Sequence, residues 1–139
     1  MTETKYSKYF VTEPKGQVRA DDGKLVFDKG ILARKEELGA ECVIAYQAFT
    51  KPWYNYVKKP HKHDFHQLIC FLGSNPLDLY EFDAEIELYI GEEQEKHTIT
   101  RSTIVSIPPF LEHCPLHFVK VDKPFIFLEV MFVGKYSRI

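Results

Sequence analysis

Short runs of strand-forming residues, separated by turn residues, fill most of this sequence and constrain its fold more than any other feature. The clearest of these runs cover residues 42–50, 66–72, 84–90, 98–107, 118–121 and 125–133. Apolar and acidic residues alternate along the run 84–90, which places its apolar side chains on one sheet face and Glu85 and Glu87 on the solvent face. Closely spaced short strands with Pro and Gly between them are typical of a β-sandwich or β-barrel rather than of alternating strands and helices.

The overall composition agrees with a mostly β domain. Val, Ile, Phe, Tyr, Thr and Trp, which are favoured in strands, make up 47 of the 139 residues, against 6 Ala, 11 Leu and 2 Met. A chain of this length buries roughly two-thirds of its unfolded surface, so neither a metal nor a disulfide is required for folding. The net charge of −2 argues against a nucleic-acid surface, and no apolar run approaches the ~18 residues of a membrane helix.

The chain divides into an arm and one domain. Residues 1–24 are polar and rich in turn signals and are predicted to form an N-terminal arm, whereas residues 25–139 are predicted to form a single β domain. Within that domain, residues 31–38 fit either a short helix ended by Gly39 or a strand. The first residues lack the apolar core of a secretory signal. Three cysteines without a CxxC pair indicate a reducing, cytoplasmic compartment rather than a disulfide framework.

Six histidines are unevenly distributed, and their clustering is the strongest functional signal. In an extended segment, residues two apart project from the same face, so His61 and His63 present two imidazoles to one point, with Gln67 on the same side if the strand is regular. His66 has the opposite parity and is predicted to be a sheet-surface residue or a hydrogen-bond partner. A second strand carrying His113 supplies a third imidazole. Such a set suits a first-row transition metal: Fe, Mn, Ni, Cu or Zn.

Two segments carry a resemblance to a known family. Residues 61–67, which read His-Lys-His-Asp-Phe-His-Gln, resemble the first motif of the cupin superfamily, in which His-x-His is followed by Glu. Residues 108–113 resemble the second motif, Pro-x-Gly-x-x-His. The resemblance implies an all-β fold, the double-stranded β-helix or cupin-type jelly-roll barrel, with a divalent metal inside its mouth. It also implies that His61, His63 and His113 are the imidazole ligands.

Several positions depart from the cupin pattern. Gln67 stands where the family has its glutamate ligand, and an amide is a weaker ligand than a carboxylate. Either the Gln67 carbonyl oxygen or a water fills the fourth ligand position, and His117, four residues after His113, is a second candidate. Phe110 replaces the family's glycine before the last histidine, and Asn55 also occupies a position that is commonly Gly. Both Phe110 and His117 are predicted to lie at the pocket.

Glu129 interrupts an apolar run and is the candidate catalytic group. It shares a strand face with Phe127, and a buried carboxylate is costly unless it is paired or functional. The alternative is an edge strand from which Glu129 faces solvent. Phe127 is predicted to line the pocket, and Trp53 either rims the pocket mouth or packs at a subunit interface. Cys114 is predicted to be a small packed hydrophobe, and His97 an exposed turn residue.

Two functions fit these features. The first is a metal-dependent enzyme acting on a small organic molecule, and cupins include dioxygenases, isomerases and decarboxylases, among which the fold does not choose. The second is a non-catalytic module that uses the same fold to hold or sense a small molecule or a metal. Both predict a cytoplasmic protein that forms a homodimer and binds neither nucleic acid nor membrane.

Overall fold

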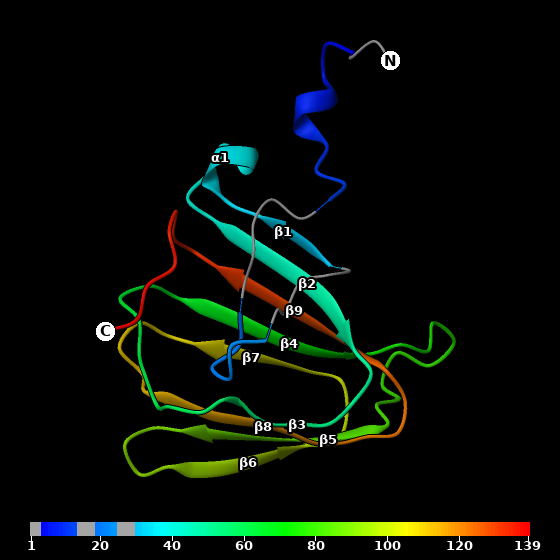
Figure 1. Ribbon diagram of the computed structural model, residues 1–139, viewed down its shortest axis with the longest axis vertical. Helices are drawn as coiled ribbons and strands as arrows, with labels where there is room; N and C mark the ends of the chain where they lie inside the picture. Colours follow the sequence, from blue (N-terminus) through cyan, green and yellow to red (C-terminus); the bar gives the residue numbers. More distant parts are fainter. Residues whose placement is uncertain (1–3, 14–18, 25–29) are drawn as a thin grey trace.

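The computed structural model describes residues 4–13, 19–24 and 30–139, and its strands form two antiparallel sheets (Figure 1). The larger sheet has the order β1-β2-β9-β4-β7 and the smaller sheet the order β3-β8-β5-β6. The strands are β1 (Ile31–Ala33), β2 (Val43–Phe49), β3 (Trp53–Val57), β4 (Gln67–Gly73), β5 (Ala84–Ile90), β6 (Glu95–Ile99), β7 (Thr103–Ile107), β8 (His113–Val121) and β9 (Phe125–Met131); the helices are η1 (Ser7–Tyr9) and α1 (Lys35–Leu38). The predicted all-β fold is confirmed, although the described strands form two separate sheets rather than one closed barrel.

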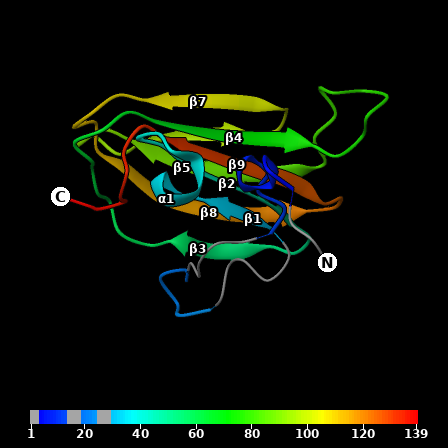
Figure 2. The ribbon, with the colours of Figure 1, turned by 90° about the horizontal axis from the view of Figure 1, so that it is seen from above.

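Strand β9 lies at the centre of the larger sheet and presents its inner face to the cavity and core. It pairs antiparallel with β2 on one side and β4 on the other, so Ala45 and Ile69 lie opposite Glu129 on its two flanks. Because side chains alternate along a strand, Phe125, Phe127 and Glu129 point to the same face. Figure 2, seen from above, shows β3 of the smaller sheet on the far side of the molecule from β4 and β7.

Aromatic side chains from both sheets fill one end of the space between them. The Phe118 side chain of β8 has no exposed surface, and its ring centroid lies 4.5 Å from that of Phe49 and 5.2 Å from that of Phe125. Phe71 of β4 is equally buried. These residues lie toward the end of the sandwich where β4 ends and β9 begins, so the opposite end, where β4 and β8 begin, is left for polar residues.

The strands differ from the sequence prediction in ways that have local causes. The run 98–107 is divided between two strands, β6 and β7, and His97 lies exposed on the edge strand β6, not in a turn, with its Nε2 atom 2.5 Å from Glu95 Oε1. Four of the five β6 residues are exposed, so this edge strand lacks the apolar alternation that identifies a strand. Residues 31–38 contain both predicted alternatives, since β1 is followed by α1, which ends at Gly39 with a φ of 68°.

The three cysteines, all in the described part of the chain, are free thiols, as the absence of a CxxC pair predicts. Across residues 4–13, 19–24 and 30–139, no helix is long and apolar enough to span a membrane. The predicted boundary between arm and domain follows residue 24, and residues 25–29 lie outside the described residues, so this division stays a prediction.

Candidate metal and small-molecule site

Two segments meet at the end of the sandwich where β4 and β8 begin, and they bring three histidines together. His61 and His113 form an isolated antiparallel bridge, in which the His61 amide donates to the His113 carbonyl at 3.0 Å and the His113 amide donates back at 2.9 Å. The carbonyl of His63 accepts from the Phe110 amide at 2.7 Å. Residues 62–66 are irregular and do not form a strand. The rings are therefore positioned by these hydrogen bonds between the two motifs and not by the alternation of side chains along a strand.

The three imidazole rings are close neighbours. Their centroids are 4.6 Å apart for His61 and His113, 4.9 Å for His61 and His63, and 5.1 Å for His63 and His113. Because a metal–nitrogen bond is about 2.1 Å long, two imidazoles on one metal have centroids about 4.5–5.2 Å apart. The spacing of the ring centroids alone fits a shared metal ion, but His63 is not in the group of described residues whose potential ligand atoms lie within 4.8 Å of one another.

Each ring is held through one nitrogen, which leaves the other for a ligand. In all three, Nδ1 lies within hydrogen-bond distance of a backbone carbonyl oxygen. The pairs are His61 with Lys59 at 3.0 Å, His63 with Ser137 at 2.6 Å and His113 with Leu111 at 2.9 Å. A carbonyl oxygen only accepts, so Nδ1 carries the proton and Nε2 of the neutral ring keeps its lone pair. This arrangement is typical of histidines that bind metals.

Burial keeps these histidines neutral. It lowers the pKa of His61 to about 4, and it also lowers the pKa of His63 and of His113, with the positive charge of Arg138 acting in the same direction. Neutral imidazole is the form that binds metals, so the trio is ready to bind a metal at neutral pH without losing a proton.

His63 has a further feature that points to a ligand. Its side chain is 2% exposed, and within the described part of the chain its Nε2 atom is buried without a hydrogen-bond partner. A buried polar atom without a partner costs free energy, so its presence calls for a bound group or a functional role.

Cys114 is a fourth potential ligand that the sequence interpretation missed. The ligand atoms of His61, His113 and Cys114 all lie within 4.8 Å of one another. Cys114 has a φ of 82°, which breaks the strand alternation and brings its side chain to the same side as that of its neighbour His113. Burial raises the pKa of the Cys114 thiol well above its usual value, so the protonated thiol is a weaker ligand than the neutral imidazoles.

Gln67, which replaces the glutamate of the cupin pattern, contacts the candidate catalytic group. Its Nε2 atom donates to Glu129 Oε2 at 2.9 Å. Gln67 lies opposite Met131 and Glu129 lies opposite Ile69, so the two polar residues are diagonal neighbours on β4 and β9. Gln67 is 4% exposed, and among the described residues its Oε1 atom has no hydrogen-bond partner, which leaves this oxygen for a bound group.

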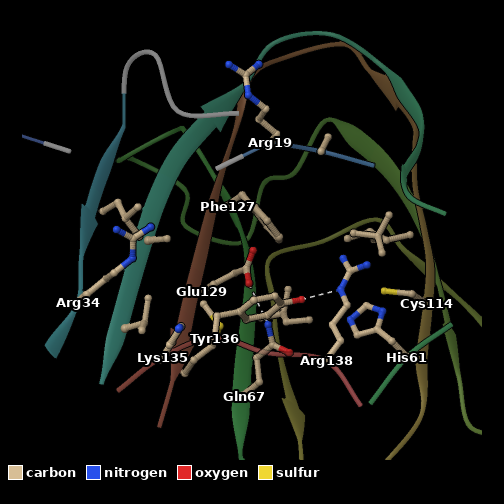
Figure 3. Close-up of a pocket in the computed structure, with 18 of the residues that line it drawn as sticks. Arg19, Arg34, His61, Gln67, Cys114, Phe127, Glu129, Lys135, Tyr136 and Arg138 are labelled. Atoms are coloured by element: carbon tan, nitrogen blue, oxygen red, sulfur yellow. Dashed lines mark hydrogen bonds between the residues drawn. The ribbon is translucent and has the colours of Figure 1, made fainter. Parts of the chain in front are cut away.

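Glu129 lies on an inner strand, so the alternative of an exposed edge strand is wrong. Its carboxyl group points into a cavity (Figure 3). Burial raises the pKa of Glu129 to about 7, although the hydrogen bond from Gln67 and the charge of Arg138 act to lower it. A carboxyl group with a pKa near neutrality is suited to accept a proton from a bound molecule and to return it.

A cavity of about 880 Å³ lies between the two sheets, and His61 and His113 line it, whereas His63 does not. Apolar side chains form much of its wall, namely Leu32, Val43, Ile69, Leu116, Phe127 and Met131. Figure 3 shows Glu129, Gln67 and Tyr136 at its centre and Arg138, His61 and Cys114 gathered on one side. An apolar wall with a few convergent polar groups is typical of a small-molecule site.

Residues 134–139, which follow β9, supply four cavity residues that the sequence interpretation missed, namely Gly134, Lys135, Tyr136 and Arg138. The Tyr136 ring centroid lies 5.1 Å from that of His63, and the Tyr136 hydroxyl accepts a hydrogen bond from Arg138 Nε at 2.8 Å. The Ile139 amide donates to the Lys62 carbonyl at 2.9 Å and ties this segment to the first motif. The segment carries no motif and no apolar alternation, so no sequence signal identified it.

His117 is not a cavity residue, which corrects its prediction as a pocket residue and spare ligand. Its Nδ1 atom accepts from the Asn55 amide at 2.9 Å, and its ring stacks on Tyr54 with centroids 4.0 Å apart. The alternation that places His117 on the face of His113 is interrupted by the left-handed backbone of Cys114 and by a register shift between β5 and β8. His117 therefore lies on the opposite face of β8.

Phe110 differs from its prediction, because it does not line the described cavity. Trp53 does not line this cavity either, and its alternative, packing at a subunit interface, stays a prediction. Phe110 is 62% exposed and has a φ of 67°, in the left-handed region that suits the glycine of the family motif. Trp53 packs edge-on against Phe49 with centroids 6.0 Å apart, and its Nε1 atom donates to Asp22 Oδ2 at 2.9 Å. Phe127 lines the cavity.

One smaller expectation agrees with the structure. His66 is a hydrogen-bond partner, with its Nε2 atom 2.6 Å from the Ser106 hydroxyl oxygen. Asn55, at a position where cupins commonly have Gly, has a φ of 57°, a conformation that Asn tolerates better than most residues.

Comparison with known proteins shows the fold. No protein-family model matches the chain, and no curated protein matches it. Among solved structures, an uncharacterised conserved protein with a double-stranded β-helix domain from Klebsiella pneumoniae is 15% identical, with a TM-score of 0.52 over 96% of this chain and 85% of its own. A recombinant oxalate oxidase in complex with glycolate is 10% identical, with a TM-score of 0.54 over 95% of this chain and 63% of its own.

A third similar structure shows how little the fold says about the reaction. Peruvianin-I, a cysteine peptidase from Thevetia peruviana latex, is 11% identical, with a TM-score of 0.57 over 98% of this chain and 78% of its own. An oxidase and a peptidase thus share the architecture of this chain, so a function has to be argued from the side chains in the cavity.

Proposed function

We propose that this chain, which has the double-stranded β-helix fold of the cupin superfamily, binds a divalent transition metal through His61, His63 and His113 and acts as an enzyme on a small organic molecule. The supporting observation is the trio of neutral imidazoles with centroids 4.6 to 5.1 Å apart, of which His61 and His113 line the cavity. When bound, the metal supplies Lewis-acid activation of a carbonyl or carboxylate, or dioxygen chemistry if it is ferrous iron. Fe, Mn, Ni, Cu and Zn all accept imidazole ligands.

The chain's own residues provide proton transfer and a shielded site. Glu129, with a pKa of about 7, takes a proton from the bound molecule or gives one to it. Gln67 orients this carboxyl group through its 2.9 Å hydrogen bond. Phe127 and Ile69 form part of the apolar wall, which excludes water and strengthens the electrostatic interactions inside. These roles suit a dioxygenase, an isomerase or a decarboxylase.

The second candidate is a non-catalytic module that holds or senses a small molecule or a metal. Gln67 supports it, because an amide in place of the family's glutamate leaves the charge of a divalent metal uncompensated. Turnover separates the two candidates: an enzyme consumes oxygen or changes the mass of its substrate, and a sensing module releases its ligand unchanged. A cytoplasmic location and a homodimer remain part of the proposal.

The experiment is metal analysis of protein purified without an affinity tag, followed by oxygen-uptake and mass measurements with small keto acids and diketones. We expect close to one equivalent of metal per chain, and loss of that metal in His61→Ala and in His113→Ala. His97→Ala is the matched control, because His97 lies exposed on the edge strand β6. Less than a tenth of an equivalent of any transition metal in the unmodified protein would refute the proposal.

A further inference from the structure

Arg138 places a positive charge inside the cavity, beside the histidine cluster. Figure 3 shows its side chain next to His61 and Cys114, and all three residues line the cavity. A guanidinium group has five N–H donors. Among the described residues, its acceptors are the Tyr136 hydroxyl, 2.8 Å from Nε, and the Asp21 carboxylate, 3.5 Å from one terminal nitrogen. Most of its hydrogen-bonding capacity is therefore left for a bound molecule.

The pairing with Asp21 leaves Arg138 only weakly compensated. The contact is long at 3.5 Å, and the two side chains are 36% and 23% exposed. Asp21 also accepts a hydrogen bond from the Lys58 amide at 2.6 Å, so its carboxylate is shared. An exposed ion pair of this kind adds little stability, so it does not by itself explain an arginine that reaches into the cavity.

A divalent metal on the histidine cluster would leave the site with an excess of positive charge. The imidazoles of the cluster are neutral, and Gln67 stands where cupins have a negatively charged ligand. A divalent metal on the cluster would therefore add two positive charges beside Arg138 without a carboxylate ligand from the chain. Glu129 accepts a hydrogen bond from Gln67, a neutral amide, and an excess of one sign of charge inside a site is costly unless it is paired. A bound anion between the guanidinium and the cluster compensates both.

The rest of the wall indicates what the anion carries. Leu116, Ile69 and Phe127 line the cavity, which at about 880 Å³ has room for a molecule much larger than an inorganic anion. We propose that the cavity binds a small carboxylic acid with an apolar body, whose carboxylate lies between Arg138 and the histidine cluster and whose body packs against this apolar wall. This inference rests on the proposed function in one respect, since it names the class of substrate for the same site.

The test is a ¹⁹F NMR titration of the 139-residue chain with three probes, once without metal and once loaded with Zn(II). The probes are 4-fluorobenzoate, the neutral isostere 4-fluorobenzamide, and fluoroacetate, which keeps the carboxylate but lacks the apolar body. We expect 4-fluorobenzoate to bind at least tenfold more tightly than either of the others. Arg138→Gln should weaken 4-fluorobenzoate at least tenfold and leave 4-fluorobenzamide unchanged, because a charge-assisted hydrogen bond is lost.

Two variants control for structural effects. Arg138→Lys keeps the charge without the planar fork and should retain part of the affinity lost in Arg138→Gln. Arg101→Gln removes an arginine that lies over the Tyr80 ring, does not line the cavity, and should leave all three affinities unchanged. A thermal melt of each variant identifies loss of folding, and Arg138→Lys keeps the test decisive if Arg138→Gln does not fold.

The possible failures are distinguishable. If Zn(II) does not bind, the proposed function fails, and the titration of metal-free protein still tests Arg138. If Zn(II) binds but Arg138→Gln leaves the affinity for 4-fluorobenzoate unchanged, the inference is overturned while the metal site stands. Equal affinities for 4-fluorobenzoate and 4-fluorobenzamide would overturn the claim that the site recognises a carboxylate. Equal affinities for 4-fluorobenzoate and fluoroacetate would overturn the claim that an apolar body packs against the wall.

Discussion

Glu129 should make the stability of this protein fall as the pH rises. Burial raises its pKa from 4.5 to about 7 in the folded state, whereas the unfolded chain exposes the carboxyl group to water and restores the ordinary pKa. The folded state therefore binds this proton more tightly than the unfolded state. The stabilisation is fully present below about pH 4.5, declines above it, and is lost as the pH rises through about 7.

The size of the effect follows from the two pKa values. A difference of one pKa unit corresponds to about 1.4 kcal/mol, so the rise of the Glu129 pKa from 4.5 to about 7 corresponds to about 3 kcal/mol. The Glu129→Gln variant has no titrating proton, and its amide oxygen can still accept the hydrogen bond from Gln67. We therefore expect the free energy of unfolding of the unmodified protein to fall by about 3 kcal/mol relative to Glu129→Gln between pH 4.5 and pH 8.

The assay is urea denaturation of the metal-free protein, in the presence of a chelator, at several pH values between 4.5 and 8.5. Subtracting the Glu129→Gln curve removes the contributions of all other titrating groups, including the buried histidines. Glu85→Gln is the matched control, because Glu85 lies on β5 and points away from the core, and its curve should run parallel to that of the unmodified protein. A flat difference curve for Glu129→Gln, or one of opposite slope, would refute a buried carboxyl with a raised pKa.

Three further perturbations test other parts of the structure. Removing residues 137–139 takes away the Ser137 carbonyl, which accepts a hydrogen bond from Nδ1 of His63. Because the truncation also removes Arg138, the reference is the Arg138→Gln variant, and relative to it we expect the affinity for Zn(II) to fall about 10–100-fold in a chelator competition. Phe110→Gly replaces an exposed side chain at a φ of 67° and should raise the free energy of unfolding by up to about 1 kcal/mol, measured in urea, whereas Phe110→Ala should not. Phe118→Ala deletes a ring with no exposed surface and should lower the free energy of unfolding by about 3–5 kcal/mol in the same assay.

Each of these expectations has a result that contradicts it. Unchanged affinity for Zn(II) after truncation would show that the Ser137 carbonyl does not orient His63. Equal stability of the Gly and Ala variants at position 110 would show that the left-handed backbone there carries no strain. An effect of Phe118→Ala no larger than that of Val119→Ala, whose side chain is 39% exposed, would contradict a packed core between the sheets.

The strand pattern was readable from the sequence wherever one face of a strand is buried. Along β5 the buried residues Ala84, Ile86 and Leu88 alternate with Glu85 and Glu87, so the apolar pattern predicts both the strand and its inner face. The edge strand β6 was not readable, because it has little apolar face to bury. Its pairing with β5 through the backbone leaves no signal in the order of side chains.

The candidate site was predictable to the extent that its residues belong to local motifs. The His-x-His spacing and the second motif indicated His61, His63 and His113. The structure brings the centroids of these rings within 5.1 Å of one another, although Cys114, not His63, joins His61 and His113 in the group of close ligand atoms. Tyr136 and Arg138 were not predictable, because they belong to a segment that reaches the cavity only through contacts with distant residues.

The sequence by itself determined the class of fold, the inner faces of the regular strands and the presence of a histidine cluster, because these depend on residue type and on spacings of a few residues. The tertiary structure decided which side chains share the cavity. His117 lies outside it because the backbone at Cys114 breaks the alternation, and Glu129 lies inside it because β9 is paired on both sides. Strand order, register and local backbone irregularities arise from contacts between segments far apart in the chain, and local periodicity carries no information about them.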